Sequence, residues 1–290
     1  MPKKRASRPQ KNVSRLEGQS KRQNTKYSVV RLTSPLDIVT MITLNEETER
    51  GNIIMELGGL QKLTLLDYPE HVACTVFTVG CNFRCPFCHN SSLVLPGKVH
   101  EEGTVKEEEF FKFLDKRQGL LDGVAITGGE PLLQPDIKEF IKKIRAKGYL
   151  VKLDTNGAFP GKLQELLDEG LVDYVAMDIK SCLEAYGPVC GLKDPPVAKL
   201  KESIEILRKG KVPYEFRTTV IDELHDEDVF EKIGELIEGE EKYFLQRFED
   251  SGELIEEGKF HAPDEEKLMK LLEIVRKKVP KAQIRGGEIL

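Results

Sequence analysis

The chain has 290 residues, of which 39% are hydrophobic and 32% charged, and its formal net charge is −5. It contains no run of about 18 apolar residues and no apolar stretch behind its basic N-terminus, so neither a membrane span nor a signal peptide is expected. These values exclude a membrane protein and a wholly disordered chain, and they favour a soluble, cytoplasmic, folded protein.

Charge is spread unevenly along the chain. Residues 1–54 carry 11 Lys and Arg against 5 Asp and Glu (+6), whereas residues 55–290 carry 33 against 44 (−11). The first segment begins with almost no apolar residues, so we predict a disordered basic extension. It could serve as a basic arm for nucleic acid, although nucleic-acid binding is not expected, or it could be untranslated, with Met55 as the true start. Residues 55–290 would then form the single core domain.

The core alternates apolar runs with amphipathic segments. Strands are predicted at 72–78, 123–128, 149–155, 172–180, 213–220 and 242–248. Helices are predicted between and after them, at about 106–116, 137–147, 161–171, 197–209 and 226–237 and in a last segment around Leu268 to Val275. Strands joined by helical crossovers indicate a parallel sheet covered by helices. The pattern fits a partial (β/α)6 barrel of the TIM type or a doubly wound sheet, and periodicity does not choose between them.

The polar and glycine-rich motifs follow the predicted strands. A cysteine-rich loop follows the first strand, "TGGEP" ends the second, "DTNG" the third and "DIKS" the fourth. In parallel α/β folds the chemistry lies at the carboxyl ends of the strands. We therefore expect these motifs to meet at one site.

Three cysteines carry the strongest chemical signal. Cys81, Cys85 and Cys88 form C-x3-C-x2-C, and soft thiolates select iron–sulfur clusters, zinc or Cu(I). A structural zinc site needs four ligands, and the only local candidate, His89, is adjacent to Cys88. A disulfide or unliganded thiols are further alternatives. A [4Fe–4S] cube has four corners, so three thiolates leave one iron open for a substrate.

Two of these motifs resemble those of a known protein family. "CNFRCPFC" resembles the cluster loop of the radical S-adenosylmethionine (SAM) superfamily, with Phe87 at its aromatic position. "GGEP" is similar to the family's motif for the SAM amino group, formed here by Gly128, Gly129 and Glu130. The resemblance implies one [4Fe–4S] cluster bound by the three cysteines, SAM as a cofactor, and the six-unit partial barrel.

Within that family, residues 55–290 are most similar to the glycyl-radical-enzyme activating enzymes, in particular the activating protein of anaerobic ribonucleoside-triphosphate reductase. This resemblance implies that Asn90 and Asp154 lie against SAM and that Lys180 meets its carboxylate. It also implies that Asp154, Thr155 and Asp178 could hold a monovalent cation. The alternatives are helix caps or turns for the first two residues and a solvated surface lysine for Lys180.

The activity that the resemblance implies is reductive cleavage of SAM to a 5′-deoxyadenosyl radical, which abstracts hydrogen from a glycine Cα of a partner. The partners would be a glycyl-radical enzyme and an electron donor such as ferredoxin or flavodoxin. The alternatives are another glycyl-radical enzyme, a small molecule or nucleoside as the substrate, or, in a different class, a zinc-binding scaffold.

The remaining candidates are assigned weaker roles. Cys74 is predicted to be a buried, inert thiol, and Cys182 and Cys190 to be structural. Arg217 and Gln246 end strands and could face the substrate opening. A second "GGE" at 286–288 lacks a recognisable strand and is interpreted as a coincidence. Four scattered histidines are expected to be exposed and without a role: His71, His100, His225 and His261.

Overall fold

A computed structural model describes residue 55 and residues 57–95, 104–250 and 252–286. The predicted disorder of residues 1–54 and the alternative start at Met55 concern a segment outside these residues. In the described part of the chain, no helix is long and apolar enough to cross a membrane.

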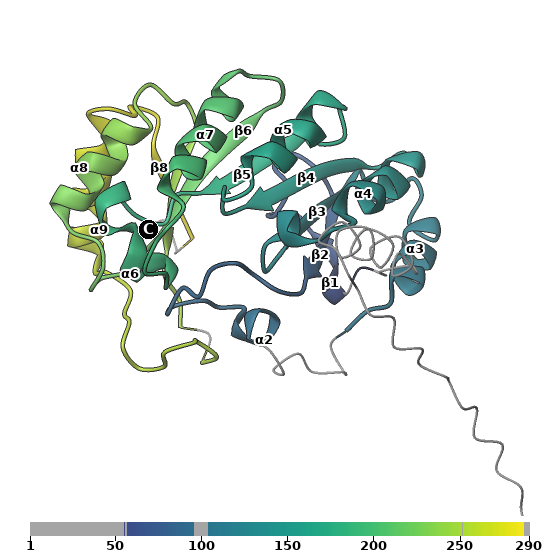
Figure 1. The fold of residues 1–290 in the computed structure, drawn as a ribbon, viewed down its shortest axis with the longest axis horizontal. Helices are drawn as coiled ribbons and strands as arrows, with labels where there is room; N and C mark the ends of the chain where they lie inside the picture. Colours follow the sequence, from purple (N-terminus) through teal and green to yellow (C-terminus); the bar gives the residue numbers. More distant parts are fainter. Residues whose placement is uncertain (1–54, 56, 96–103, 251, 287–290) are drawn as a thin grey trace, which may run out of the picture. The chain divides into compact units, whose positions relative to one another are not determined.

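Eight strands form one sheet whose spatial order follows the chain (Figure 1). Strands β2 to β8 are parallel, and β1 pairs antiparallel with β2. The strands are β1 (Leu57–Thr64), β2 (Ala73–Thr78), β3 (Gly123–Gly128), β4 (Leu150–Thr155), β5 (Tyr174–Asp178), β6 (Tyr214–Val220), β7 (Tyr243–Arg247) and β8 (Gln283–Arg285). The six predicted strands correspond to β2 through β7 and are confirmed, with β1 and β8 as additional edge strands.

The six predicted helices are also present. They are α3 (Glu107–Asp115), α4 (Ile137–Ala146), α5 (Pro160–Asp168), α7 (Val197–Arg208), α8 (Glu227–Leu236) and α9 (Glu265–Arg276). Shorter helical turns lie in the loops that follow strands: α2 (Ser91–Val94), η2 (Pro131–Leu133), η3 (Leu183–Ala185) and α6 (Tyr186–Cys190). Figure 1 shows α4, α5 and α7 running alongside the strands that they connect.

The two faces of the sheet differ in polarity. On α4, the apolar stripe of Ile137, Phe140, Ile141 and Ile144 is buried in the core. In β4 the side chains alternate, so that Val151 and Leu153 join the core while Lys152 and Asp154 occupy the opposite face. The apolar face packs against helices, and the polar face lines the inside of an open, partial barrel. This is the predicted (β/α)6 architecture.

The C-terminal segment corrects one prediction. Gln283–Arg285 forms β8, with Ile284 opposite Leu245 of β7, although no strand was expected before the second "GGE". A three-residue strand with one apolar side chain is too short to show a period of two. Residues 287 and 288 of that motif lie outside the described part of the chain.

Candidate active site

A cavity of about 560 Å³ lies at the carboxyl ends of the parallel strands. Its size is in the usual range for small-molecule sites. It brings together all twelve residues that the sequence assigned to a cluster, to SAM or to a cation: Cys81, Cys85, Phe87, Cys88, Asn90, Gly128, Gly129, Glu130, Asp154, Thr155, Asp178 and Lys180. These residues come from the ends of four strands and the loops that follow them, as expected for a parallel sheet.

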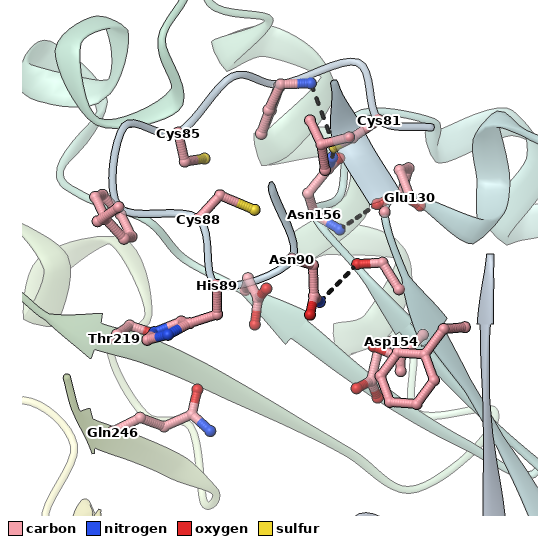
Figure 2. Close-up of a pocket in the computed structure, with 18 of the residues that line it drawn as sticks. Cys81, Cys85, Cys88, His89, Asn90, Glu130, Asp154, Asn156, Thr219 and Gln246 are labelled. Atoms are coloured by element: carbon pink, nitrogen blue, oxygen red, sulfur yellow. Dashed lines mark hydrogen bonds between the residues drawn. The ribbon is translucent and has the colours of Figure 1, made fainter. Parts of the chain in front are cut away.

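The cysteine loop after β2 is fixed by hydrogen bonds of its own. Nη1 of Arg84 donates to the carbonyls of Cys81 (2.6 Å) and Phe83 (2.7 Å). The backbone N–H of Cys88 donates to the carbonyl of Cys85 (3.0 Å). Figure 2 shows the Cys85 and Cys88 sulfurs pointing from the loop toward the same side. The loop therefore presents its thiols to the cavity rather than to one another.

The segment after β5 supports the cysteine loop from outside. The backbone N–H of Arg84 donates to the carbonyl of Cys190 at the end of α6 (2.9 Å). The Phe83 ring meets Tyr186 edge to face, with ring centroids 6.3 Å apart. Gly191 has a φ of +68°, and a Cβ there would lie 2.1 Å from the Arg84 carbonyl oxygen. The close approach of α6 to the loop therefore requires glycine at this position.

We expect Gly191→Ala to destabilise the protein by about 1–3 kcal/mol more than Gly170→Ala. Both glycines have positive φ, but a Cβ at Gly170 would meet nothing within 4 Å. The difference between the variants thus isolates the contact with Arg84. Urea unfolding of the two full-length variants measures it, and equal losses would contradict a tight contact between α6 and the cysteine loop.

The three thiols share one electrostatic environment. Burial raises the pKa of Cys81 to about 11 and that of Cys85 to about 12, and it also raises the pKa of Cys88. The Lys180 ammonium lowers the pKa of all three. Ligation to iron would have to remove these protons, and Lys180 is the cation placed to favour that loss.

The donor set fits an open iron–sulfur cluster better than zinc. Within the described residues, no three His, Cys, Asp or Glu side chains are gathered as a single metal ion would need. The His89 ring lies beside Phe248, at a centroid distance of 5.2 Å. Cys81, Cys85 and Cys88 are the only cysteines among the residues described as lining the cavity, which suits a four-iron cube with one free corner.

The Glu130 carboxylate is buried and accepts three hydrogen bonds from neighbouring residues. Its Oε1 accepts hydrogen bonds from the backbone of Leu132 (3.1 Å) and the Thr155 hydroxyl (2.8 Å). Its Oε2 accepts from the backbone of Asn156 (2.7 Å). Burial outweighs these bonds and raises the pKa of Glu130 to about 7. A cation bound beside it would therefore be favoured, because it would compensate the buried charge.

The two glycines before Glu130 have a packing role. A Cβ at Gly128 would lie 2.4 Å from the Thr78 backbone nitrogen, and one at Gly129 would lie 1.9 Å from the Gly80 carbonyl oxygen. The backbone N–H of Glu130 donates to that same carbonyl (2.9 Å). The motif therefore joins the end of β3 directly to the start of the cysteine loop, which positions Glu130 relative to the thiols.

Two asparagines tie neighbouring loops together. Nδ2 of Asn90 donates to the Gly128 carbonyl (3.1 Å), and its side chain makes no cap bond to α2. Nδ2 of Asn156 donates to Oδ1 of Asn82 (2.8 Å), while its own Oδ1 accepts from the backbone of Ala158 (3.0 Å). Asn156 therefore closes a turn on its own backbone and also links that turn to the cysteine loop.

Five charged residues form a continuous series across β4, β5 and β6, which we call the charge ladder: Lys152, Asp154, Arg217, Asp178 and Lys180. Lys152 pairs with Oδ1 of Asp154, whose Oδ2 accepts from Nη2 of Arg217 (2.9 Å). Nε of Arg217 donates to Oδ1 of Asp178 (2.7 Å), whose Oδ2 pairs with Nζ of Lys180 (2.8 Å). Each carboxylate therefore lies between two cations.

The ladder keeps its two carboxylates and Lys180 ionised. Burial alone would raise the pKa of Asp178, but Arg217 and Lys180 outweigh it and hold that pKa well below the usual range. The pKa of Asp154 is likewise lowered against burial by Arg217 and Lys152. Burial would lower the pKa of Lys180, but Asp178 raises it above the usual range. Lys180 is thus a partly buried, paired cation and not the solvated surface lysine of the alternative interpretation.

His225 corrects a second prediction, since it was expected to be exposed and is only 1% exposed. Its Nδ1 accepts from the backbone N–H of Ile221 (2.9 Å), so Nε2 carries the proton and donates to the Lys180 carbonyl (2.9 Å). Burial outweighs these bonds and lowers its pKa to about 4. A neutral imidazole therefore fixes the backbone of Lys180, which spacing along the sequence could not indicate.

His225 should make the protein sensitive to acid. Its folded pKa of about 4 lies below its usual value of 6.5, so the unfolded chain binds more protons as the pH falls through this window. Between pH 7 and pH 4, we expect the free energy of unfolding of the wild type to fall by roughly 3 kcal/mol more than that of His225→Gln. Glu130 acts in the opposite direction but is present in both proteins. Unfolding free energies across this range test the difference, and parallel curves would contradict it.

The other cysteines stand apart from the cavity. All six described cysteines are free thiols, and Cys74, Cys182 and Cys190 are each no more than 3% exposed. Burial raises the pKa of Cys74 to about 12, as expected for an inert thiol. The predicted structural role of Cys182 and Cys190 agrees with their burial in the core.

Comparison with known proteins assigns the family. Residues 75–236 match the radical SAM superfamily, a span of more than half of the chain that includes the cysteine loop, the glycine motif and the charge ladder up to Arg217. The chain therefore belongs to the radical SAM superfamily, and it is an enzyme of the class whose members use a [4Fe–4S] cluster and SAM.

Two relatives indicate which group within the superfamily the chain resembles. The chain is 33% identical over 236 residues to a Methanocaldococcus jannaschii protein provisionally named a glycyl-radical enzyme activating enzyme, which covers 79% of this chain and 95% of the relative. It is 32% identical to the pyruvate formate-lyase-activating enzyme of Clostridium pasteurianum over 44% of this chain and 53% of the relative. These matches confirm the resemblance to the activating enzymes.

A solved structure supports the fold alone. The Streptococcus suis protein SuiB, bound to its precursor peptide SuiA, superimposes with a TM-score of 0.56 at 14% identity. The match covers 91% of this chain and 58% of SuiB.

Proposed function

We propose that the chain binds a [4Fe–4S] cluster through Cys81, Cys85 and Cys88 and binds SAM against the iron that these thiols leave free. The observation that carries this proposal is the convergence, in one cavity, of three thiols with a buried carboxylate and a partly buried ammonium. SAM carries both an ammonium and a carboxylate, so a site with one group of each opposite charge can bind both ends.

In this proposal each residue has a distinct task. Glu130 accepts a hydrogen bond from the SAM ammonium, and Lys180 pairs with the SAM carboxylate. Asn90 and Asp154 lie against the remainder of SAM, and Phe87, 3% exposed, shields the cluster from water. When bound, the cluster would supply the electron that cleaves the sulfonium C–S bond to methionine and a 5′-deoxyadenosyl radical. The chain itself positions SAM and excludes water.

We further propose a glycyl-radical enzyme as the protein substrate, specifically an anaerobic ribonucleotide reductase, with a ferredoxin or flavodoxin as the electron donor in a reducing cytoplasm. Support comes from the names of the relatives, which describe activation of glycyl-radical enzymes. The lining on the β6 and β7 side of the cavity also suits a polypeptide, because Thr219, Gln246, Arg247 and Asp250 offer uncharged and charged groups together. Figure 2 places Thr219 and Gln246 on this side, away from Glu130.

An anaerobic assay tests the proposed substrate. The reconstituted, dithionite-reduced chain is mixed with SAM and an anaerobic ribonucleotide reductase from the same organism, and the mixture is examined by EPR spectroscopy. We expect a glycyl doublet that disappears when the radical-bearing glycine of the reductase is replaced by alanine. Formation of 5′-deoxyadenosine without a radical on the reductase would contradict this substrate and would favour a small molecule or another glycyl-radical enzyme.

A further inference from the structure

The centre of the charge ladder is occupied by a side chain of the protein. Arg217 extends from β6, where it lies opposite Asp178 of the neighbouring strand β5. Its guanidinium donates to Asp178 through Nε and reaches past β5 to Asp154 at the end of β4 through Nη2. The side chain of Arg217 is 14% exposed. A planar guanidinium with several donors is well suited to joining two carboxylates in this way.

The two carboxylates expected to bind a monovalent cation are already paired with cations of the protein. Both carboxylate oxygens of Asp154 and both of Asp178 accept from ladder cations. The Thr155 hydroxyl donates to Glu130 and accepts from the backbone N–H of Gly157 (3.1 Å). A potassium or sodium ion could use only the lone pairs that remain on these oxygens. It would then lie beside Arg217 and Lys180, which already pair with the same carboxylates and would repel it.

We propose that Arg217 replaces the monovalent cation in this enzyme: its guanidinium supplies the fixed positive charge between Asp154 and Asp178 that positions Lys180 and Asp154 for SAM. The inference rests on the proposed binding of SAM in this cavity. Arg217 is a positioning residue, because it acts through its two carboxylate partners. SAM binding should therefore be independent of added sodium or potassium.

The independence of SAM binding from added cations can be tested on the reconstituted, full-length wild-type enzyme. The dissociation constant of SAM is measured by equilibrium dialysis in tetramethylammonium chloride and in potassium chloride at equal ionic strength, since tetramethylammonium is too large for an ion site between two carboxylates. We expect the two constants to agree within about twofold. Binding that is at least tenfold tighter in potassium would overturn the proposal. Wild type that binds SAM in neither salt would instead contradict the proposed function.

A pair of variants tests the role of the residue. In Arg217→Gln, SAM binding in tetramethylammonium should weaken at least tenfold and be partly restored by potassium or by guanidinium ion. The control is Arg208→Gln, since Arg208 also lies between two carboxylates, Glu205 and Glu240, but on α7 outside the cavity. This control should bind SAM as wild type does. Wild-type affinity of Arg217→Gln in tetramethylammonium would overturn the proposal, and weakened affinity that no cation restores would do so as well.

Discussion

Cys85→Ala is expected to abolish cluster binding. The side chain of Cys85 is buried at the centre of the cysteine loop, and its loss leaves two thiolates for a cluster that here has only three. Two ligands cannot retain a [4Fe–4S] cube in competition with chelators and solvent. After anaerobic reconstitution, we expect about four iron atoms per chain in wild type and fewer than about one in the variant.

The matched control is Cys182→Ala. Cys182 is a free thiol that is as buried as Cys85, and it lies in the segment that supports the loop, but it does not line the cavity. This variant should bind the full complement of iron. Iron and sulfide analysis with visible absorption spectra provides the measurement. Equal iron contents in Cys85→Ala and wild type would contradict the assignment of the three cysteines as cluster ligands.

Glu130→Gln is expected to cost the enzyme most of its affinity for SAM. The change removes the negative charge that would accept a hydrogen bond from the ammonium, and hydrogen bonds to charged groups contribute about 1.5–3 kcal/mol. Since about 1.4 kcal/mol corresponds to tenfold, the dissociation constant should rise by roughly 10- to 100-fold. The amide also places a donor where the carboxylate now accepts from Thr155 and Asn156, which adds to the loss.

Glu215→Gln separates this effect from the general cost of removing a buried charge. Glu215 is 1% exposed, as Glu130 is, and its carboxylate is bonded to Arg285 and Tyr174. It lies inside the barrel but is not among the residues lining the cavity. This variant should be less stable than wild type yet bind SAM within about twofold of it. Similar losses of SAM affinity in both variants would show that Glu130 acts through stability alone. Equilibrium dialysis on reconstituted protein measures both.

The sequence predicted the fold well because its signals are local. The six predicted parallel strands are apolar runs, and the helices have a clear 3.6-residue period. Ile137 and Phe140, three positions apart on one helix face, accordingly pack in the core. β1 and β8 were missed for different reasons. β1 contains two glycines and three exposed residues, and β8 is only three residues long.

The site was predictable where motifs end strands and unpredictable where contacts are distant in sequence. The cysteine loop and the glycine motif are contiguous and could be recognised. The link between Asn156 and Asn82 joins residues 74 positions apart, and that between Arg217 and Asp154 spans 63. Neither leaves a pattern in the sequence. His225 could not be distinguished from exposed histidines, because its burial depends on tertiary packing around Lys180.

Formation of 5′-deoxyadenosine tests the central claim most directly. The reconstituted full-length chain is reduced with dithionite under strict exclusion of oxygen and supplied with SAM, and the products are separated by chromatography, with Cys85→Ala treated in parallel. The proposed function predicts 5′-deoxyadenosine and methionine in equal amounts from wild type and neither product from the variant. A wild-type protein that carries about four irons per chain and binds SAM, but forms no more 5′-deoxyadenosine than Cys85→Ala, would contradict it.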